Sequence, residues 1–445
     1  MSTILVLGAG MVARPLVRYL LDQEGFQVKV ASRTVSKAEA MIEGHPDGEA
    51  MTFDATREMA DLGGLVKEAD LTVSLLPFAH HVDVANRCID EGKPMVTTSY
   101  LSEPMKALDK KAKDAGIIIL NEIGLDPGID HMSAMKIIHD IQGSGGEVTD
   151  FSSYCGALPS PEAGINPFGY KFSWSPRGVL LASRNPARFI KDGQELAVSG
   201  ENLFEHYTLV DIEGLGVFEQ YPNRDSIPYL ETYGIESART MYRATLRNLG
   251  WCETMRKIVD LDLLNDEARP DLDGKSFEEV LRGCLGCSSD QDIEEAVAEK
   301  LGVDTYATVL KRLKWLGLLG QEKIPAGSGS LLDALVAQML KKLSLKPGER
   351  DMVVMHHDFK ARFESQGKGA HIMSIFVDYG DPDGDTSVAK TVALPAAIGV
   401  KLILQGKIDV KGVQVPVIKS IYEPVLAELE NVGVTFKETR IDHSL

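Results

Sequence analysis

Cysteine is scarce in this sequence of 445 residues, basic residues are outnumbered, and long apolar runs are missing. The five cysteines are odd in number and scattered, which favours a reducing compartment over a disulfide-stabilised fold. No apolar run approaches the roughly 20 residues of a membrane-spanning helix. Met-Ser-Thr leads directly into the first expected strand, so we expect no signal or transit segment. We therefore expect a cytoplasmic protein without a membrane partner.

Acidic residues dominate the charge. The 65 Asp and Glu residues against 47 Lys and Arg residues give a formal net charge of −18. Nucleic acids and anionic membranes bind basic surfaces, so neither is expected as a partner. If the substrate or the cofactor is an anion, Arg and Lys side chains have to gather in the site against this overall charge.

The candidate metal ligands form no convincing set. The Cys-Leu-Gly-Cys segment at 284–287 lacks the two further ligands that zinc needs and the thioredoxin-like setting of redox-active pairs. The adjacent histidine pairs at 80–81 and 356–357 point in different directions in either a helix or a strand. We expect no bound metal.

Residues 1–124 alternate short apolar strands with helical patterns, which is typical of a parallel sheet with helices on both faces. This part of the chain predicts an N-terminal Rossmann-like domain in an α/β protein. The expected strands are Thr3–Leu7, Gln27–Ala31, Ala50–Phe53, Leu71–Leu75, Pro94–Thr97 and Gly116–Leu120.

The remainder is expected to form two further domains. Segments 125–234 and 345–445 mix strands and helices, and we expect them to build one mixed α/β domain for substrate binding and dimerisation. Segment 235–344 looks almost wholly helical and is expected as an inserted helical domain, with amphipathic stretches at Ile293–Leu301 and Tyr306–Leu316.

The C-terminal part is expected to contain a hairpin followed by further helices and a strand. Two apolar runs, Asp351–Phe363 and His371–Asp378, flank a turn and predict a β-hairpin. A helical run at Lys390–Leu404, a short strand and a last helix follow. Part of 388–412 could pack back on the first domain.

A dinucleotide-binding fingerprint lies at the start of the chain. The apolar strand Ile4–Leu7 runs directly into Gly-Ala-Gly-Met-Val-Ala at 8–13, a GxGxxA pattern that opens a helix. Gly8 permits a tight turn, Gly10 lets the backbone approach a pyrophosphate, and the helix N-terminus faces the phosphates. The alternative is a purely structural turn, but the position between a strand and a helix favours a nucleotide.

The end of the second strand selects the nucleotide. NAD-specific proteins carry Asp or Glu there for the ribose hydroxyls, whereas this strand ends in Ser32, Arg33 and Thr34. The Arg33 guanidinium can pair with a 2′-phosphate, which predicts NADP(H) rather than NAD(H). The alternative is a solvated Arg33. Asp54, after the third strand, is either a partner of the adenine amino group or a turn residue.

Further polar residues follow the later strands. Leu75 and the segment from Thr97 to Tyr100 should line the nicotinamide half of the site. After the sixth strand, Asp126 places a carboxylate where doubly wound folds carry their chemistry. The alternative is that Asp126 and Asp130 only cap the following helix.

Several long sequence blocks carry a family resemblance. They are Asn121 to His131, Ser153 to Gly156, Gly169 to Ala182, Tyr221 to Ser226, Thr245 to Arg247 and Asp378 to Gly380. Together they resemble the L-glutamate-forming saccharopine dehydrogenases over nearly the whole chain. The resemblance implies a three-domain, usually dimeric subunit that uses NADP(H). It also implies the reaction that interconverts saccharopine, NADP⁺ and water with L-glutamate, 2-aminoadipate 6-semialdehyde and NADPH in lysine metabolism.

The resemblance assigns residues to both ligands. On the substrate it implies Ser99, Tyr100, Asp126, Arg224, Thr245, Leu246 and Arg247. Along the cofactor, beside the turn at Gly8, it implies Gly10, Met11, Val12, Ser32, Arg33, Thr34, Asp54, Leu75, Thr97, Thr98, Leu125 and Ser175.

Three arginines suit such a substrate. Saccharopine carries three carboxylates, so its site needs several cations, and Arg pairs carboxylates bidentately. Arg224, Arg243 and Arg247 can supply them, and the last two share a face if their segment is helical. The alternative for each is a surface ion pair; the resemblance favours Arg224 and Arg247 more than Arg243.

The expected chemistry is reduction of an imine, in either direction. Asp126 would bind the substrate nitrogen or move a proton, and Tyr100 would relay a proton or only pack. One alternative is an imine reductase similar to carboxynorspermidine dehydrogenase, whose polyamine substrate requires an acidic site. The other is an NADP(H)-binding sensor without turnover.

Overall fold

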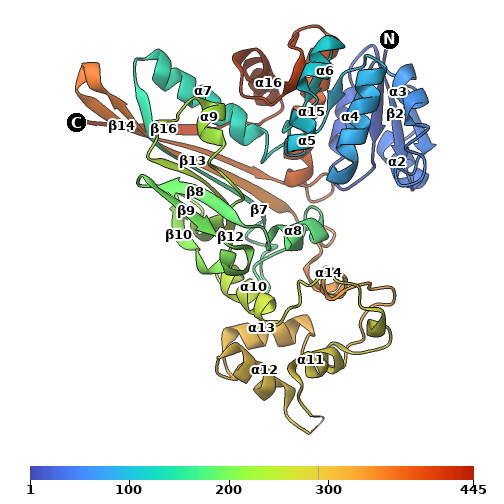
Figure 1. Ribbon diagram of the computed structural model, residues 1–445, viewed down its shortest axis with the longest axis vertical. Helices are drawn as coiled ribbons and strands as arrows, with labels where there is room; N and C mark the ends of the chain where they lie inside the picture. Colours follow the sequence, from blue (N-terminus) through green and yellow to red (C-terminus); the bar gives the residue numbers. More distant parts are fainter. Residues whose placement is uncertain (289, 445) are drawn as a thin grey trace. The chain divides into compact units, whose positions relative to one another are not determined.

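The computed structural model describes residues 1–288 and 290–444 (Figure 1). The chain forms two compact units. Unit 1 comprises Met1–Val148, Thr232–Ile235 and Lys360–Leu445, and unit 2 comprises Thr149–Glu231 and Glu236–Phe359. The finer division into three domains stays a prediction.

Unit 1 contains a seven-stranded sheet in the order β15-β6-β5-β4-β1-β2-β3, and all its pairings are parallel. All six expected strands are confirmed, and so is the expected Rossmann-like architecture. A seventh strand, β15, comes from the C-terminal part of the chain and pairs with β6. The bounds are β1 Ser2–Leu7, β2 Phe26–Ser32, β3 Gly48–Thr52, β4 Leu71–Ser74, β5 Met95–Val96, β6 Ile118–Leu120 and β15 Gly412–Gln414.

Helices cover this sheet because each presents an apolar stripe to it. In α1 the buried residues Leu16, Val17, Leu20 and Leu21 recur at helical spacing, and Pro15 near its start needs no intrahelical hydrogen bond. The helices of unit 1 are α1 Arg14–Leu21, α2 Val35–Ile42, α3 Leu62–Glu68, α4 His81–Asp90, α5 Glu103–Lys106, α6 Asp109–Asp114, α7 Ile129–Gly143, α15 Ser387–Leu404 and α16 Lys419–Asn431.

Helix α15 corrects one expectation from the sequence. Its 18 residues are long and apolar enough to cross a membrane, although no such segment was expected. In the fold, 67% of that window is buried, and the helix packs against α1 and α16. A Cβ at Gly399 would lie 3.1 Å from Ile123, so the helix also approaches the chain beyond β6 closely. Helix α15 is therefore a core helix of unit 1, whose apolar residues are covered by protein.

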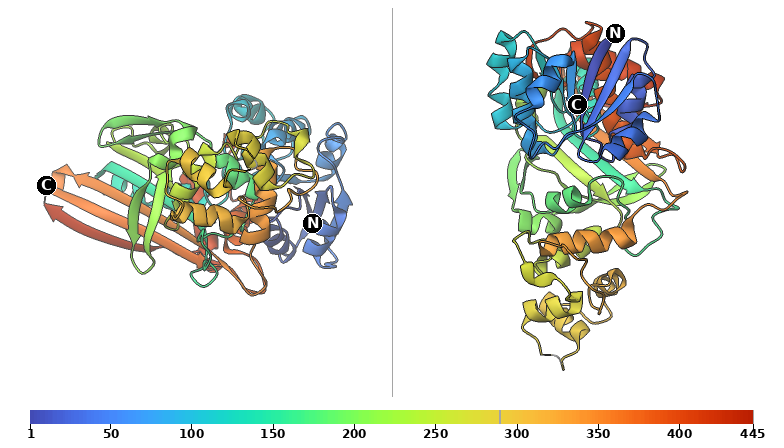
Figure 2. Two further views of the ribbon diagram at one scale, coloured as in Figure 1. Left: turned by 90° about the horizontal axis from the view of Figure 1, so that it is seen from below. Right: turned by 90° about the vertical axis from the view of Figure 1, so that its right-hand side faces the viewer.

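The C-terminus adds a strand that the sequence did not predict. Strand β14 (Lys368–Tyr379) pairs antiparallel with β16 (Lys437–Ser444), from Lys368 opposite Ser444 to Ile375 opposite Lys437. Figure 2 shows these two long strands side by side near the C-terminus. Every residue of β16 is exposed, so no alternation of apolar and polar residues marks it in the sequence.

Unit 2 carries a second, mixed sheet in which strands run in the order β10-β11-β12-β7-β13. Strands β12 and β7 are parallel, β11 is antiparallel to β12, and the β8–β9 hairpin joins β12 through β8. Both strands of the expected hairpin, β13 and β14, are present and flank a short turn. The bounds are β7 Glu147–Pro159, β8 Ala187–Lys191, β9 Gln194–Val198, β10 Thr208–Ile212, β11 Gly216–Pro222, β12 Thr240–Arg247 and β13 Asp351–Phe363, of which 147–148 and 360–363 belong to unit 1.

The expectation that 235–344 is almost wholly helical is wrong at its start, where β12 forms. Its sequence has no strong preference for helix or strand. Pairing with β7 and β11 on either side stabilises the strand. The helices that follow include both amphipathic stretches expected from the sequence. The helices of unit 2 are α8 Pro176–Ala182, α10 Trp251–Asp260, α11 Phe277–Leu285, α12 Ile293–Leu301, α13 Thr308–Leu316 and α14 Leu331–Leu343; α9 (Tyr229–Tyr233) begins here and ends in unit 1.

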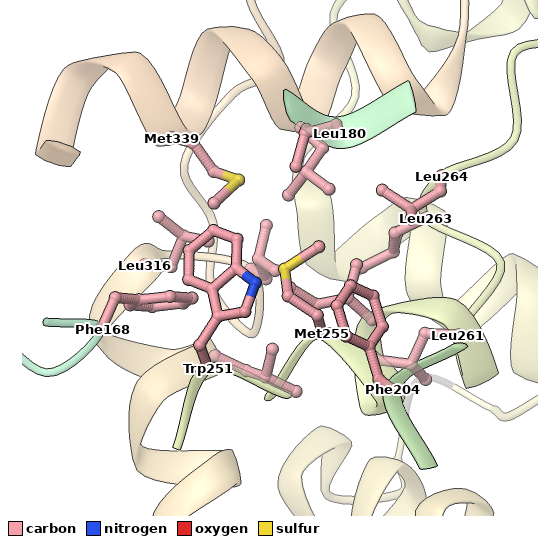
Figure 3. Close-up of a cluster of buried hydrophobic side chains, with 14 of the residues drawn as sticks. Phe168, Leu180, Phe204, Trp251, Met255, Leu261, Leu263, Leu264, Leu316 and Met339 are labelled. Carbon is pink, nitrogen blue, oxygen red and sulfur yellow. The ribbon is translucent and has the colours of Figure 1, made fainter. Parts of the chain in front are cut away.

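One buried cluster joins the helices and strands of unit 2. Figure 3 shows Trp251 and Met255 of α10 facing Leu316 of α13 and Met339 of α14. The same cluster includes Tyr242 of β12. The sheet and the helical segment therefore share a hydrophobic core.

Candidate functional site

The loop after β1 has the shape that a pyrophosphate needs. Gly8 has a φ of +108°, and a Cβ there would lie 2.9 Å from the carbonyl oxygen of Leu75 at the end of β4. Strands β1 and β4 are neighbours at the point where the strand order reverses, which is where doubly wound folds bind nucleotides. A Cβ at Gly10 would meet no atom within 4 Å, so this glycine leaves space that a phosphate can occupy. Ala13 is fully buried where α1 begins, as the fingerprint requires.

The ends of β2 and β3 suit a phosphorylated ribose. Ser32, Arg33 and Thr34 follow β2 without an acidic residue, and Arg33 is exposed. Asp54, after β3, accepts hydrogen bonds from the backbone N and the Oγ1 of Thr56 at 3.0 and 2.7 Å. These bonds hold the pKa of Asp54 below its usual range, with a smaller contribution from Arg33. The geometry favours the turn interpretation of Asp54; contact with adenine stays a prediction.

A buried histidine connects the ends of β4 and β5. The His81 ring, 4% exposed, lies 2.9 Å from Oγ of Ser74 through Nδ1 and 2.7 Å from Oγ of Ser99 through Nε2. Burial lowers the pKa of His81 to about 4, with the neighbouring His80 adding to the shift. The ring is therefore neutral at pH 7 and holds Ser99 in place. In the sequence, His81 stands out only as half of an adjacent histidine pair that is unsuited to a metal.

The turn after β6 brings Asp126 to Tyr100. The Tyr100 hydroxyl donates to Oδ1 of Asp126 at 3.1 Å. Gly128 permits this turn, since its φ is +148° and a Cβ would lie 2.0 Å from the carbonyl oxygen of Gly124. Oδ1 of Asp130 accepts from the backbone N of Gly128 at 2.6 Å, so Asp130 holds the turn that opens α7. Asp130 thus orders the turn before α7, and a capping role for Asp126 stays a prediction.

In unit 2, Arg247 is buried among aromatic rings. It is 4% exposed, and its guanidinium lies 5.3, 5.8 and 5.4 Å from the ring centres of Tyr170, Tyr221 and Trp251. Nη1 donates to the carbonyl oxygen of Leu246 at 2.8 Å, and Nε has no hydrogen-bond partner. No carboxylate among residues 1–288 and 290–444 forms an ion pair with this cation. A buried cation without a counter-ion is costly, so the position is suited to an anionic ligand.

The other predicted substrate residues of unit 2 lie close to Arg247 in the chain or in the sheet. Arg243 and Arg247 share a face of β12, because side chains alternate along a strand; the conditional expectation of a helical face was wrong, although the shared face remains. Arg243 is 2% exposed and stacks at 4.6 Å on the ring of Tyr229. The turn containing Arg224 is adjacent, since the backbone N of Asn223 donates to the carbonyl of Arg243.

The predicted residues thus form two groups. The carboxyl ends of the parallel strands bring together the unit 1 group, which comprises Gly8, Gly10, Met11, Val12, Ser32, Arg33, Thr34, Asp54, Leu75, Thr97, Thr98, Ser99, Tyr100, Leu125 and Asp126. The unit 2 group comprises Ser175, which caps α8 by accepting from the backbone N of Gly178, together with Arg224, Arg243, Thr245, Leu246 and Arg247. In the described residues, no three His, Cys, Asp or Glu side chains could hold a metal ion.

A Rossmann sheet with this glycine turn, no acid after β2 and polar groups at the later strand ends defines a dinucleotide-dependent oxidoreductase. Sequence profiles agree: the saccharopine dehydrogenase NADP binding domain matches residues 4–120, and the saccharopine dehydrogenase C-terminal domain matches residues 124–434. The chain belongs to the saccharopine dehydrogenase family, and its N-terminal part is an NADP-binding domain. The expected family and cofactor are confirmed.

Individual relatives resemble the chain along its length. It is 38% identical to the saccharopine dehydrogenase (NADP⁺, L-glutamate-forming) of Schizosaccharomyces pombe, over 99% of this chain and 100% of the relative. It is 40% identical to the mitochondrial alpha-aminoadipic semialdehyde synthase of Bos taurus over 97% of this chain, and it spans about half of that longer protein (47%). The apo structure of saccharopine dehydrogenase (L-Glu forming) from Saccharomyces cerevisiae has a TM-score of 0.88 at 36% identity, over 99% of this chain and 100% of that one.

The two fingerprint glycines should respond differently to the same substitution. In Gly8→Ala the Cβ strains the backbone against Leu75, so the free energy of unfolding should fall by about 1–3 kcal/mol. In Gly10→Ala the Cβ meets no protein atom, so stability should stay within about 0.5 kcal/mol, while the NADPH dissociation constant should rise at least roughly tenfold. Urea unfolding and NADPH fluorescence titration measure both quantities. Unchanged NADPH affinity in Gly10→Ala would show that the loop does not contact the cofactor.

His81 should make stability depend on pH. Its pKa is about 4 in the fold, below the value of about 6.5 in the unfolded chain, so the unfolded chain binds more protons between these values. Stability from neutral His81 is therefore present above pH 6.5 and is lost as the pH falls towards 4. Between pH 7 and 4 the protein should lose about 3 kcal/mol more unfolding free energy than His81→Gln. Parallel pH profiles for the two proteins would contradict this account.

Proposed function

We propose that the protein interconverts saccharopine, NADP⁺ and water with L-glutamate, 2-aminoadipate 6-semialdehyde, NADPH and a proton, as part of lysine metabolism. The observation that carries the proposal is Arg247, a buried guanidinium without a carboxylate partner among the described residues. Saccharopine has three carboxylates, and such a cation is suited to one of them. Fungal relatives that carry the name of this reaction match the chain over their full length.

Residues of unit 1 would hold the cofactor and act on the substrate nitrogen. The turn from Gly8 to Gly10 and the start of α1 would bind the pyrophosphate, and Arg33 would pair with the 2′-phosphate. When bound, NADPH supplies the hydride. The Tyr100 hydroxyl donates a hydrogen bond to Asp126 and so orients its carboxylate. An ionised carboxylate there would bind an ammonium or iminium nitrogen, or accept its proton.

Residues of unit 2 would bind the substrate carboxylates. Arg247 would pair with a carboxylate under the rings of Tyr170 and Trp251, and Arg224 and Arg243 would bind further carboxylates. The arginines disfavour the imine reductase similar to carboxynorspermidine dehydrogenase, because a polyamine would be repelled. Retention of the Tyr100–Asp126 pair disfavours the non-catalytic sensor.

The test is NADPH oxidation followed at 340 nm with three additions: glutamate plus the semialdehyde, a diamine plus the same aldehyde, and the aldehyde alone. Turnover is expected only with glutamate. Asp126→Asn should lower kcat by roughly a hundredfold or more, the size expected for loss of a general acid–base group, with NADPH binding retained. Turnover only with the diamine would support the alternative reductase, and none with either amine would support the sensor.

We further propose that the protein is a homodimer in the cytoplasm. The family resemblance supports dimerisation. Five free cysteines support a reducing compartment. Sedimentation velocity and cell fractionation test these statements, and a monomer or a secreted protein would contradict them.

A further inference from the structure

Unit 1 buries a cluster of titratable side chains beside the Tyr100–Asp126 pair. Glu122 is 4% exposed, Asp130 is 2% exposed, His131 is fully buried, and Tyr233 is 2% exposed. Burying carboxylates and an imidazole costs free energy unless each has hydrogen-bond partners. Apolar residues would fill the same space at lower cost, so packing alone does not explain these four residue types.

Glu122 clamps the chain on both sides of Tyr100. Its backbone N donates to the carbonyl oxygen of Ser99 at 3.1 Å, and Oε1 of its carboxylate accepts from the backbone N of Leu101 at 2.7 Å. Glu122 has a φ of +56°, a conformation rarely adopted outside glycine, Asn and Asp, and this conformation accompanies both bonds. The peptide units before and after Tyr100 are thus both tied to one residue.

The same carboxylate reaches the helix that follows Asp126. Oε2 of Glu122 lies 2.8 Å from Nε2 of His131, in the first turn of α7. Nδ1 of His131 bonds to the hydroxyl of Tyr233, which approaches from a distant part of the sequence. Because a carboxylate only accepts hydrogen bonds, Nε2 of His131 carries a proton. The Tyr233 hydroxyl at Nδ1 holds the opposite edge of the ring in place.

The start of α7 is rigidly tied to the Asp126 turn. The backbone N of Asp130 donates to the carbonyl of Leu125 at 3.1 Å, and the backbone N of Ile129 donates to the carbonyl of Gly124 at 2.8 Å. A shift of His131 therefore moves the turn that carries Asp126. One end of the chain of bonds holds Tyr100, and the other holds Asp126.

We propose that Glu122, His131 and Tyr233 are positioning residues that fix the Tyr100–Asp126 hydrogen bond. The role of these residues in catalysis rests on the proposed function. Their structural coupling to the Tyr100–Asp126 hydrogen bond does not depend on it. Glu122 contacts the chain on both sides of Tyr100 as well as His131, whereas Tyr233 acts on this network through its bond to His131. Loss of the Glu122 carboxylate should therefore have the larger effect.

The test compares two substitutions with a matched control. In Glu122→Gln only one oxygen remains to serve both Leu101 and His131. In Tyr233→Phe the ring remains against His131, at a centroid distance of 5.8 Å, and only the hydroxyl is lost. The control is Tyr422→Phe, because Tyr422 bonds to Nδ1 of His139 at 2.7 Å on the same helix and its hydroxyl makes no bond to Glu122.

The first readout needs no turnover. Fluorotyrosine placed at position 100 reports its surroundings through its ¹⁹F resonance. The resonance should shift in Glu122→Gln, shift less in Tyr233→Phe and stay unmoved in Tyr422→Phe. An unmoved resonance in both network variants, or an equal shift in the control, would overturn the proposal.

The second readout is steady-state kinetics with saccharopine. Glu122→Gln should lower kcat by about tenfold and Tyr233→Phe by a few-fold, the sizes expected when positioning hydrogen bonds are lost. KM for saccharopine and the NADPH dissociation constant should stay within about twofold, because the arginines and the glycine loop are untouched. Wild-type kcat in both variants would overturn the catalytic role. Absence of turnover in the wild-type protein would instead contradict the proposed function, and the ¹⁹F readout would still decide the coupling.

Discussion

A cation buried without a counter-ion is the constraint on which this account depends. The chain carries a net charge of −18, yet Arg247 is enclosed by three aromatic rings and makes no carboxylate pair within the described residues. Such a guanidinium reduces stability, because three aromatic rings and one carbonyl compensate its desolvation only in part. It becomes favourable when a carboxylate joins it, since charge-assisted bonds are strong where water is excluded. The buried position of Arg247 in unit 2 therefore favours binding of an anionic ligand.

Unit 1 orients the groups that are expected to bind the cofactor and to act on the substrate. The carboxyl ends of its parallel strands place the glycine turn, the Arg33 loop, Ser99 and Tyr100 along one edge of a sheet. Two buried networks fix this edge: His81 holds Ser99, and Glu122 holds the peptides around Tyr100. Rigid placement of reacting groups is a large part of enzymatic acceleration. Polar side chains are buried here because they orient their neighbours.

Local patterns in the sequence were sufficient for some features. Apolar periodicity located the six N-terminal strands, and the glycine spacing with the missing acid after β2 predicted NADP(H). Strand β12 was taken for a helix because its identity depends on pairing with β7 and β11, and β16 was missed because all its side chains are exposed. His81 and Glu122 were missed as functional residues because their hydrogen bonds join separate strands, loops and helices, which no local sequence pattern reveals. The motif around Asp126 was recognised, but its hydrogen bond to Tyr100 depends on the tertiary structure and could not be predicted from the sequence.

The most direct measurement is calorimetry of saccharopine binding to the NADP(H)-bound protein and to Arg247→Met, with the unfolding free energy of both. Methionine keeps the packing against the three rings and removes the charge. We predict that the substitution raises the dissociation constant by roughly tenfold to a hundredfold, the range for a lost charge-assisted bond, and leaves the fold equally or more stable. Unchanged affinity together with a destabilised fold would contradict this prediction, because Arg247 would then be a structural residue.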